Sequence, residues 1–284
     1  MTPSLFCCPI CGNALRREAD AAGRPRALRC AKGHCFDFAR EGYAHLLPAS
    51  RMRAKVPGDS REMVAARRAF LDGGGYGPFA RALAALCLEA TDGIPCPAVL
   101  DAGCGEGYYT RALADAFAQA GRPVRLAAYD ISKAAVRAAA GRDTARCIQW
   151  AVAGSFAIPL ADGAADAVAN VFSPMVAGEF ARVLKPGGAL LYAVPGPRHL
   201  WQLKEVLYDT PYENPVRDVA YPGFRLVRRV PVHATVRAEG PQVQQLFSMT
   251  PYYWKTPRAG AARLAALDAL TCEAQFDFLV YQKL

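Results

Sequence analysis

The sequence predicts an α/β protein with a Rossmann-like, mostly parallel sheet and a small N-terminal module. Three observations support this fold class. From Ala98 onward, short apolar runs alternate with helical patterns, which is typical of βαβ units. A glycine-rich turn follows the first of these runs, at residues 101–108. The first 34 residues carry two pairs of Cys or His residues whose spacing suits a metal ion.

The N-terminal pairs predict a closed zinc site. The four expected ligands are Cys8, Cys11, Cys30 and His34. Three thiolates and one imidazole complete a tetrahedral zinc ion and leave no position for water, so the zinc is expected to be structural. Two neighbours compete, because Cys7 could replace Cys8 and Cys35 could replace His34. The two-residue gap before Cys11 favours Cys8.

After these ligands, the segments 36–38 and 43–47 are expected to close a compact ribbon near Pro48. Residues 49–59 are polar and basic and predict a linker. Asp59 and Glu62 form a capping-box pattern for a helix that runs to about Asp72 and is stopped by three glycines. Pro78 then suits the first turn of a second helix.

The remaining pattern predicts the sheet. The expected parallel strands are 98–101, 125–129, 147–151, 165–172 and 189–194, with helices at about 109–120 and 133–140. The tail adds strands at 224–236 and 274–281 and helices near 243–247 and 258–270. The late strands suit an antiparallel pair at one end of a parallel sheet, and the pattern leaves the strand order open.

Composition indicates a globular chain in a reducing compartment. The chain has 284 residues, of which 52% are hydrophobic, and ten cysteines. It has no signal-peptide pattern and no apolar run of about eighteen residues, so we expect a cytoplasmic protein without membrane association. The cysteines outside the zinc site are expected to be ordinary reduced thiols.

The formal net charge of +9 is concentrated at the front of the chain. Residues 1–68 contain thirteen Lys or Arg and six Asp or Glu, a net charge of +7. Arg makes up twenty-seven of the thirty-four cations, and its planar fork suits phosphate groups. We therefore expect the front end to contact nucleic acid, with a merely solubilising surface as the alternative.

The glycine turn predicts a cofactor site. Gly103, Gly105 and Gly107 lie between a strand and a helix, where backbone amides can approach a ligand closely. Asp130 ends the next strand, where its carboxylate suits ribose hydroxyls. The glycine spacing differs from the dinucleotide fingerprint, and Asp101 suits a cationic amino group. S-adenosylmethionine fits these features. A turn without a ligand, and Asp130 as a helix cap, are the alternatives.

Four segments carry a closer resemblance. They are residues 101–110, 67–72, 184–188 and 195–200, and together with the zinc pattern they resemble the class I methyltransferases, specifically the 23S rRNA (guanine-N1)-methyltransferases. The resemblance implies Tyr76, Gly105, Glu106 and His199 as cofactor contacts. It also implies a division into a zinc-binding RNA-recognition module (1–48), a linker and connecting helix (49–76) and a methyltransferase domain (77–284).

The implied reaction moves a methyl group from S-adenosylmethionine to N1 of a guanine in a 23S rRNA hairpin. Relatives act at guanine 745 or 748, and the run at 195–200 favours 745, although the run at 170–174 resembles the second group. Asn170, Phe172 and Pro174 are expected on the acceptor side, with Phe172 as a stacking platform. The residues do not identify the general base, although His199 is a candidate.

Two other functions stay open from the sequence. A small-molecule methyltransferase would keep the cofactor site but would leave the basic zinc module unexplained. A non-catalytic RNA-binding protein would keep the fold without binding the cofactor. The chain could also form a homodimer.

Overall fold

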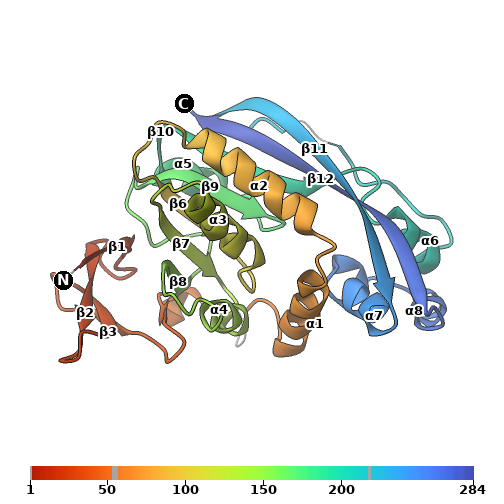
Figure 1. Ribbon diagram of the computed structural model, residues 1–284, viewed down its shortest axis with the longest axis horizontal. Coiled ribbons are helices and arrows are strands. Elements are labelled where there is room, and N and C mark those ends of the chain that lie inside the picture. The colour runs from red at the N-terminus through yellow and green to blue at the C-terminus, as the bar shows by residue number, and fades with distance from the viewer. Residues whose placement is uncertain (1, 53–56, 217–218) are drawn as a thin grey trace.

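The computed structural model describes residues 2–52, 57–216 and 219–284 (Figure 1). The predicted linker is described only in part, because residues 53–56 lie outside the described residues. Its first residues form one 3-10 turn, η1 (Ala49–Arg51). None of the helices in the described part of the chain is both long and apolar enough to cross a membrane.

An eight-stranded sheet confirms the predicted α/β fold. Its strand order is β11, β12, β10, β9, β6, β7, β8, β5. The strands from β10 to β5 run parallel, and β12 runs antiparallel to both β10 and β11. The bounds are β5 (Tyr43–His45), β6 (Ala98–Ala102), β7 (Arg125–Asp130), β8 (Ile148–Val152), β9 (Ala165–Val171), β10 (Leu184–Pro195), β11 (Phe224–Glu239) and β12 (Ala269–Lys283).

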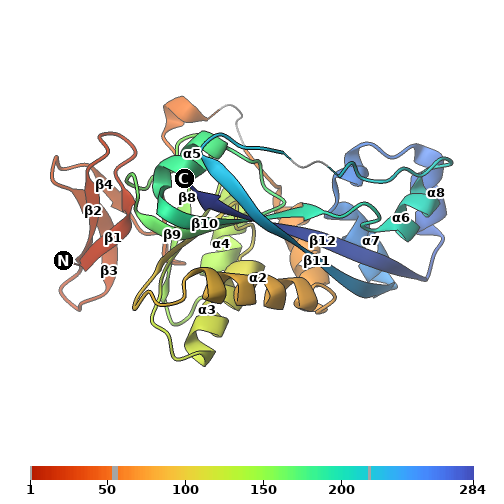
Figure 2. The same cartoon turned by 90° about the horizontal axis from the view of Figure 1, so that it is seen from above.

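Helices cover both faces of this sheet, as Figure 2 shows for α5 on one side and α2 and α3 on the other. The helices before the tail are α1 (Arg61–Asp72), α2 (Gly77–Ala90), α3 (Tyr108–Gln119), α4 (Lys133–Ala140) and α5 (Ala177–Val183). The sheet has an apolar core on each face, and successive side chains of β6 point into opposite cores. Val99 packs with Phe79 and Leu113 of α2 and α3, whereas Leu100 packs with Phe180 of α5.

The N-terminal ribbon is a separate four-stranded antiparallel sheet. Its strands are β1 (Thr2–Cys7), β2 (Ala14–Ala19), β3 (Pro25–Cys30) and β4 (Cys35–Asp37). It docks on the large domain through main-chain contacts, since the Cys7 N–H donates to the Pro159 carbonyl at 2.7 Å and Phe6 pairs with Leu160. Leu15 and Leu28 join the same apolar core as Leu100, so the ribbon continues the core on the α5 side.

One predicted part of the ribbon belongs elsewhere. The segment 43–47 was expected to close the ribbon, and this expectation is wrong, because β5 pairs in parallel with β8 at the edge of the large sheet. Tyr43 and Ala44 are buried there, and the Leu46 N–H donates to the Val152 carbonyl. The unpaired backbone edge of β8 and the apolar β5 side chains explain this placement.

The cap of α1 also differs from the prediction. Ser60 and not Asp59 is the N-cap, and its side chain accepts a hydrogen bond from the Met63 N–H. The cap of α4 is Ser132, which accepts from the Ala135 N–H. Two predictions are confirmed. Helix α1 ends before Gly73, and Pro78 lies in the first turn of α2.

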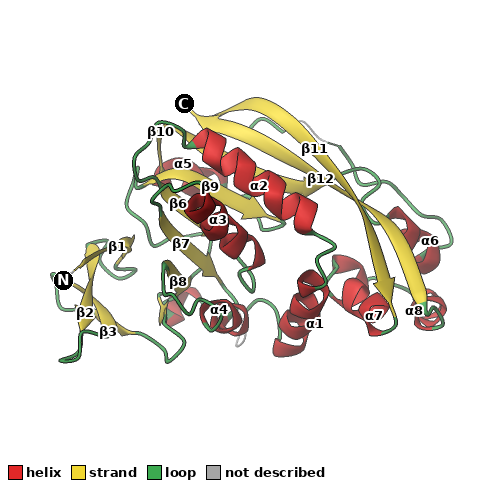
Figure 3. Ribbon diagram, viewed as in Figure 1, coloured by secondary structure: helices red, strands yellow, loops and turns green. Residues whose placement is uncertain are grey.

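The tail forms a lobe at the end of the molecule opposite the ribbon (Figures 1 and 3). β11 and β12 run on into it, and both are longer than predicted. The helix expected at 258–270 is shorter, because its last residues belong to β12. The lobe contains α6 (Trp201–Leu207), α7 (Pro241–Ser248), η2 (Pro251–Trp254) and α8 (Arg258–Ala265).

Candidate cofactor site and metal centre

The glycine turn between β6 and α3 has a backbone that favours glycine. Gly103, Gly105 and Gly107 have φ of +75°, +56° and +83°. A Cβ at Gly103 would lie 2.2 Å from Ser173 Oγ, and one at Gly107 would lie 2.9 Å from the Trp150 ring. Around a Cβ at Gly105, the nearest described atom would be 4.0 Å away. Gly105 therefore faces open space, which a ligand approaching the backbone requires.

Asp101 lies at the carboxyl end of β6 and is 1% exposed. Thr110 on the first turn of α3 donates a hydrogen bond to the Asp101 carboxyl at 2.5 Å. Burial, together with the nearby charge of Asp130, raises the pKa of Asp101 to about 7, although the Thr110 hydrogen bond opposes this shift. A cationic ligand group beside this carboxyl would stabilise its charged form. The chemistry suits an ammonium group, as the sequence predicts.

Asp130 lies at the carboxyl end of β7, beside the glycine turn. One carboxylate oxygen accepts from the Gly105 N–H at 3.0 Å, and the other accepts from the Ser132 N–H at 2.7 Å. Burial raises the pKa of Asp130. Because Ser132 supplies the side-chain cap of α4, the cap does not account for Asp130. Each carboxylate oxygen has further acceptor capacity, so the pair of ribose hydroxyls fits this position.

Glu106 lies inside the glycine turn and is 2% exposed. Neither of its carboxylate oxygens has a hydrogen-bond partner among the described residues. Guanidinium nitrogens of Arg111 and Arg142 each lie 3.7 Å from the carboxylate. Burial raises the pKa of Glu106, which the two arginines partly oppose. A buried carboxylate whose oxygens accept no hydrogen bond is costly, so this position fits a ligand that brings a donor.

Tyr76 and His199 meet although 123 residues separate them. Tyr76 precedes α2, His199 lies in the turn after β10, and the Tyr76 hydroxyl is 3.5 Å from His199 Nε2. Both side chains contact the Phe276 ring of β12, with centroids at 5.2 and 5.4 Å. Burial lowers the pKa of His199 to about 3, so the ring is neutral at physiological pH. A neutral histidine with so low a pKa is a poor general base.

The loop after β9 adjoins the glycine turn through Ser173. Asn170 is completely buried, and its side chain closes the loop by accepting from the Ser173 N–H and donating to the Pro174 carbonyl, both at 3.2 Å. Phe172 has a φ of +52° and is 46% exposed. Such a conformation is strained for phenylalanine, costing roughly 1–3 kcal/mol. Its ring lies 4.4 Å from Phe276 and 5.7 Å from His199, between centroids.

The predicted zinc ligands lie together in the ribbon. The donor atoms of Cys8, Cys11, Cys30 and His34 all lie within 4.8 Å of one another. The alternatives lie apart from this set, because Cys7 is buried in the contact with the large domain and Cys35 is exposed and donates to Asp37. Burial opposes ionisation of the Cys30 thiol, but backbone hydrogen bonds from His34 and Lys32, with those to the Cys11 and His34 side chains, lower its pKa to about 7. Three thiolates and an imidazole suit a structural zinc ion.

Three residues of the site were absent from the sequence prediction. Arg67 of α1 pairs with Asp59 and lies beside Gly105. Phe276 joins the acceptor loop to Tyr76, and no sequence signal could have found it, because its place depends on how β12 enters the sheet. Tyr109 is the second residue after Gly107, and its closeness in sequence to the glycine turn was the available signal.

Comparison with known proteins gives results that match this geometry. The family model described as "RlmA, N-terminal" matches residues 6–55, and a "Methyltransferase domain" model matches residues 99–188. A candidate 23S rRNA (guanine-N1)-methyltransferase of Micromonospora griseorubida is 39% identical, over 92% of this chain and 91% of its own. The 23S rRNA (guanine(748)-N(1))-methyltransferase of Streptomyces fradiae is 35% identical, over 93% and 91%. A further candidate from Bacillus subtilis (strain 168) is 28% identical, over 99% and 98%.

The fold, the glycine turn and the ribbon define an S-adenosylmethionine-dependent methyltransferase with an N-terminal zinc-binding domain. The extent of the similarity then gives the family. The chain belongs to the 23S rRNA (guanine-N1)-methyltransferases, because two of these relatives exceed 30% identity over nearly their whole length.

Proposed function

We propose that this enzyme transfers a methyl group from S-adenosylmethionine to N1 of a guanine in a 23S rRNA hairpin, in the cytoplasm, and that guanine 745 is the target. The Streptomyces fradiae relative, which its name assigns to guanine 748, makes that neighbouring position the competing outcome. One observation carries the proposal within the structure. The exposed ring of Phe172 stands on a loop that adjoins the glycine turn, so a base stacked on this ring would lie next to the cofactor site.

The cofactor supplies the reactive methyl group, and the chain's own residues supply alignment. We assign the nucleoside part to Asp130 and the glycine turn. We assign contacts to the rest of the cofactor to Asp101, Glu106, Tyr76 and His199. In-line transfer requires that the acceptor be aligned and water be excluded. The aromatic contacts of Phe172 and Phe276 provide an apolar wall on the acceptor side.

The target base has to be unpaired in this reaction. N1 lies on the Watson–Crick edge of guanine and carries a proton that a base pair engages, so a paired guanine cannot accept the methyl group. In the unpaired base the N1 proton is lost, the N1–methyl bond forms, and the methyl–sulfur bond breaks to leave S-adenosylhomocysteine. Stacking on an exposed aromatic ring stabilises an unpaired base by about 1–3 kcal/mol. Phe172 is therefore proposed as the platform for the flipped guanine. Asn170 is proposed to position the Phe172 loop, since its side-chain amide both donates and accepts a hydrogen bond within that loop.

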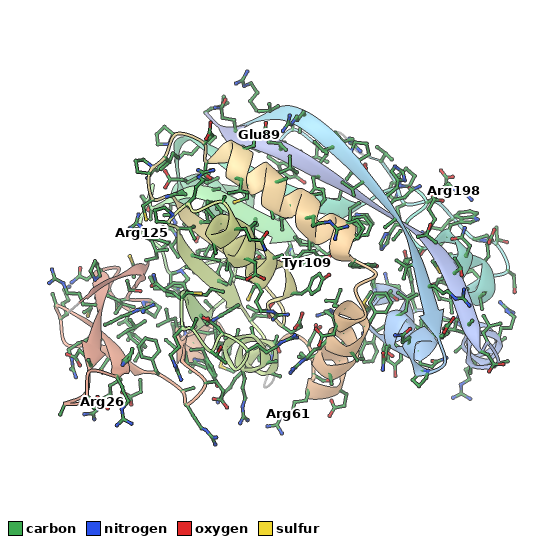
Figure 4. The ribbon with its side chains drawn as sticks, in the orientation of Figure 1. Arg26, Arg61, Glu89, Tyr109, Arg125 and Arg198 are labelled. Atoms are coloured by element: carbon green, nitrogen blue, oxygen red, sulfur yellow. The ribbon has the colours of Figure 1, made fainter. Side chains whose placement is uncertain are left out.

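The ribbon is proposed to bind the RNA backbone. Its exposed cations are Arg16, Arg24, Arg26, Arg29, Lys32 and Arg40, and Figure 4 labels Arg26 at the outer end. Arg24 and Arg29 pair with Asp20 and Glu18, which leaves the net charge of this region positive. Phosphate contacts of this kind give affinity without sequence specificity. The homodimer remains a prediction.

Transfer of a labelled methyl group to unmodified 23S rRNA tests the activity. Methylation at N1 blocks base pairing, so primer extension on the product should stop at one guanine of the hairpin. A stop at 745 supports the full proposal, and a stop at 748 overturns the choice of position alone. No transfer by protein that binds S-adenosylhomocysteine would favour a small-molecule methyltransferase. Absence of cofactor binding would favour the non-catalytic RNA-binding protein.

Charge reversal tests the role of the ribbon. Arg26→Glu with Lys32→Glu should lower kcat/KM for RNA at least about tenfold at low salt, because phosphate contacts are lost. Arg225→Glu with Lys255→Glu is the matched control, since both residues are also exposed but lie outside the ribbon. Equal losses from the ribbon pair and from this control pair would mean that overall charge, and not the ribbon, attracts the RNA.

A further inference from the structure

Two residues at the glycine turn and the start of α3 carry buried polar atoms without a hydrogen-bond partner in the described part of the chain. Within the residues that the structure describes, the buried side-chain oxygens without a hydrogen-bond partner are the two of Glu106 and the hydroxyl of Tyr109. Both residues belong to the glycine turn and the first turn of α3 that follows it. Native proteins satisfy nearly all such groups, so each of these exceptions beside the glycine turn indicates a polar ligand.

Tyr109 is not explained by packing alone. Its ring contacts the Tyr108 ring edge-on at 5.2 Å between centroids, and phenylalanine would make the same contact. A buried hydroxyl without a partner lowers stability, whereas phenylalanine carries no such penalty. The Tyr109 residue is half-buried, and Figure 4 shows its side chain between α3 and α1.

The groups around the Tyr109 hydroxyl identify the part of the cofactor that it would meet. Tyr76, Asp101 and Arg67 all lie close enough to affect its pKa electrostatically, and burial keeps the phenol protonated by raising its pKa. Asp130, which suits the ribose, lies across the glycine turn at the end of β7. Near Tyr109, the Asp101 carboxyl can accept hydrogen bonds from an ammonium group. Tyr76 and Arg67 can donate to a carboxylate. An amino-acid ligand has both of these groups.

We propose that the Tyr109 hydroxyl donates a hydrogen bond to the carboxylate at the amino-acid end of S-adenosylmethionine, while the Asp101 carboxyl faces its ammonium group. Tyr109 would then distinguish the complete cofactor from adenosine derivatives that lack the amino-acid part. The inference rests on the cofactor assignment and is independent of which RNA is methylated.

Calorimetric titration of Tyr109→Phe with two ligands tests this proposal. S-adenosylhomocysteine has the amino-acid end, and 5′-methylthioadenosine lacks it. Tyr109→Phe should bind S-adenosylhomocysteine at least about tenfold more weakly than the wild type, because a hydrogen bond to a charged group is lost. Its affinity for 5′-methylthioadenosine should stay within about twofold. Tyr108→Phe is the matched control and should bind both ligands as the wild type does.

A second readout uses the protein without ligand. Because the hydroxyl has no partner there, Tyr109→Phe should be at least as stable as the wild type in urea, and a loss of stability would overturn the proposal. Unchanged affinity for S-adenosylhomocysteine, or equal losses for both ligands, would also overturn it. Failure of the wild type to bind S-adenosylhomocysteine is a different result, which would remove the cofactor assignment itself.

Discussion

The Nδ1 atom of His199 accepts a hydrogen bond from the backbone N–H of Gln275 at 3.2 Å. An acceptor nitrogen carries no proton, so the ring proton lies on Nε2, which faces the Tyr76 hydroxyl. The turn after β10 and strand β12 thus fix both the orientation and the tautomer of the ring. These contacts hold the His199 ring as a neutral group, a state that does not suit a general base.

The protonation state of His199 predicts a pH dependence of stability. Its pKa is about 3 in the folded protein and 6.5 without perturbation, so between these values the unfolded chain binds a proton that the folded chain does not. The stability that the protein has with a neutral His199 is fully present above pH 6.5. It is lost as the pH falls from 6.5 toward 3, because the unfolded chain gains a proton there. Between pH 7 and pH 5 the wild type should lose about 2 kcal/mol that His199→Gln does not lose.

Urea unfolding at several pH values measures that difference. The wild type and His199→Gln are compared at each pH under the same conditions. If stability depended on pH in the same way for the wild type and His199→Gln, the pKa of His199 in the folded protein would be close to its unperturbed value.

Phe172 is expected to matter for RNA and not for the cofactor. Phe172→Leu should lower kcat/KM for RNA about tenfold or more by removing the stacking surface, while S-adenosylhomocysteine affinity stays within about twofold. Because the ring is half exposed, stability should change by less than about 1 kcal/mol. Phe172→Tyr keeps the ring and should restore the rate. If leucine served as well as tyrosine, stacking on this residue would be ruled out.

Lys204 is expected to fix the turn that carries His199. It is completely buried, and its ammonium donates to the Tyr212 carbonyl and to Asn214 Oδ1, each at 2.8 Å. Asn214 in turn donates to the Gly196 carbonyl at 2.8 Å. Lys204→Met should destabilise the protein by about 2–4 kcal/mol, since two charge-assisted hydrogen bonds are lost.

A double-mutant cycle of Lys204→Met with Asn214→Ala measures the coupling, which should exceed about 1 kcal/mol for residues in direct contact. Lys255→Met is the control, because Lys255 is exposed in the same lobe. Strictly additive effects of the two changes would argue against a shared network.

The zinc site is expected to support more than the ribbon. Cys11→Ser should abolish binding of one zinc equivalent, whereas Cys35→Ser should retain it, since Cys35 lies outside the ligand group. Because the ribbon shares a core with Leu100 of the large sheet, metal loss should also lower the melting temperature of the large domain, by about 5–10 °C. Metal analysis and calorimetry give the two readouts. Zinc loss from Cys35→Ser would require a different ligand set.

Local patterns predicted those parts of the site that depend on residues close together in sequence. The zinc ligands follow from pair spacing, and the glycine turn with Asp101 and Asp130 follows from strand ends that meet at one edge of a parallel sheet. Tyr109 and Phe276 were missed. Tyr109 lies in a predicted helix where most tyrosines only pack, and Phe276 reaches the site because β12 lies beside β10.

The sequence by itself determined the α/β fold, the zinc ligand group and the position of the glycine turn, because short-range spacing and periodicity dictate these features. Only the tertiary structure decided that β5 joins β8, that Tyr76 meets His199 and that the His199 ring is neutral. Strand pairing is chosen by which backbone edge is free, and the protonation of a side chain is set by its desolvation. Both depend on contacts between distant parts of the chain, which local sequence does not specify.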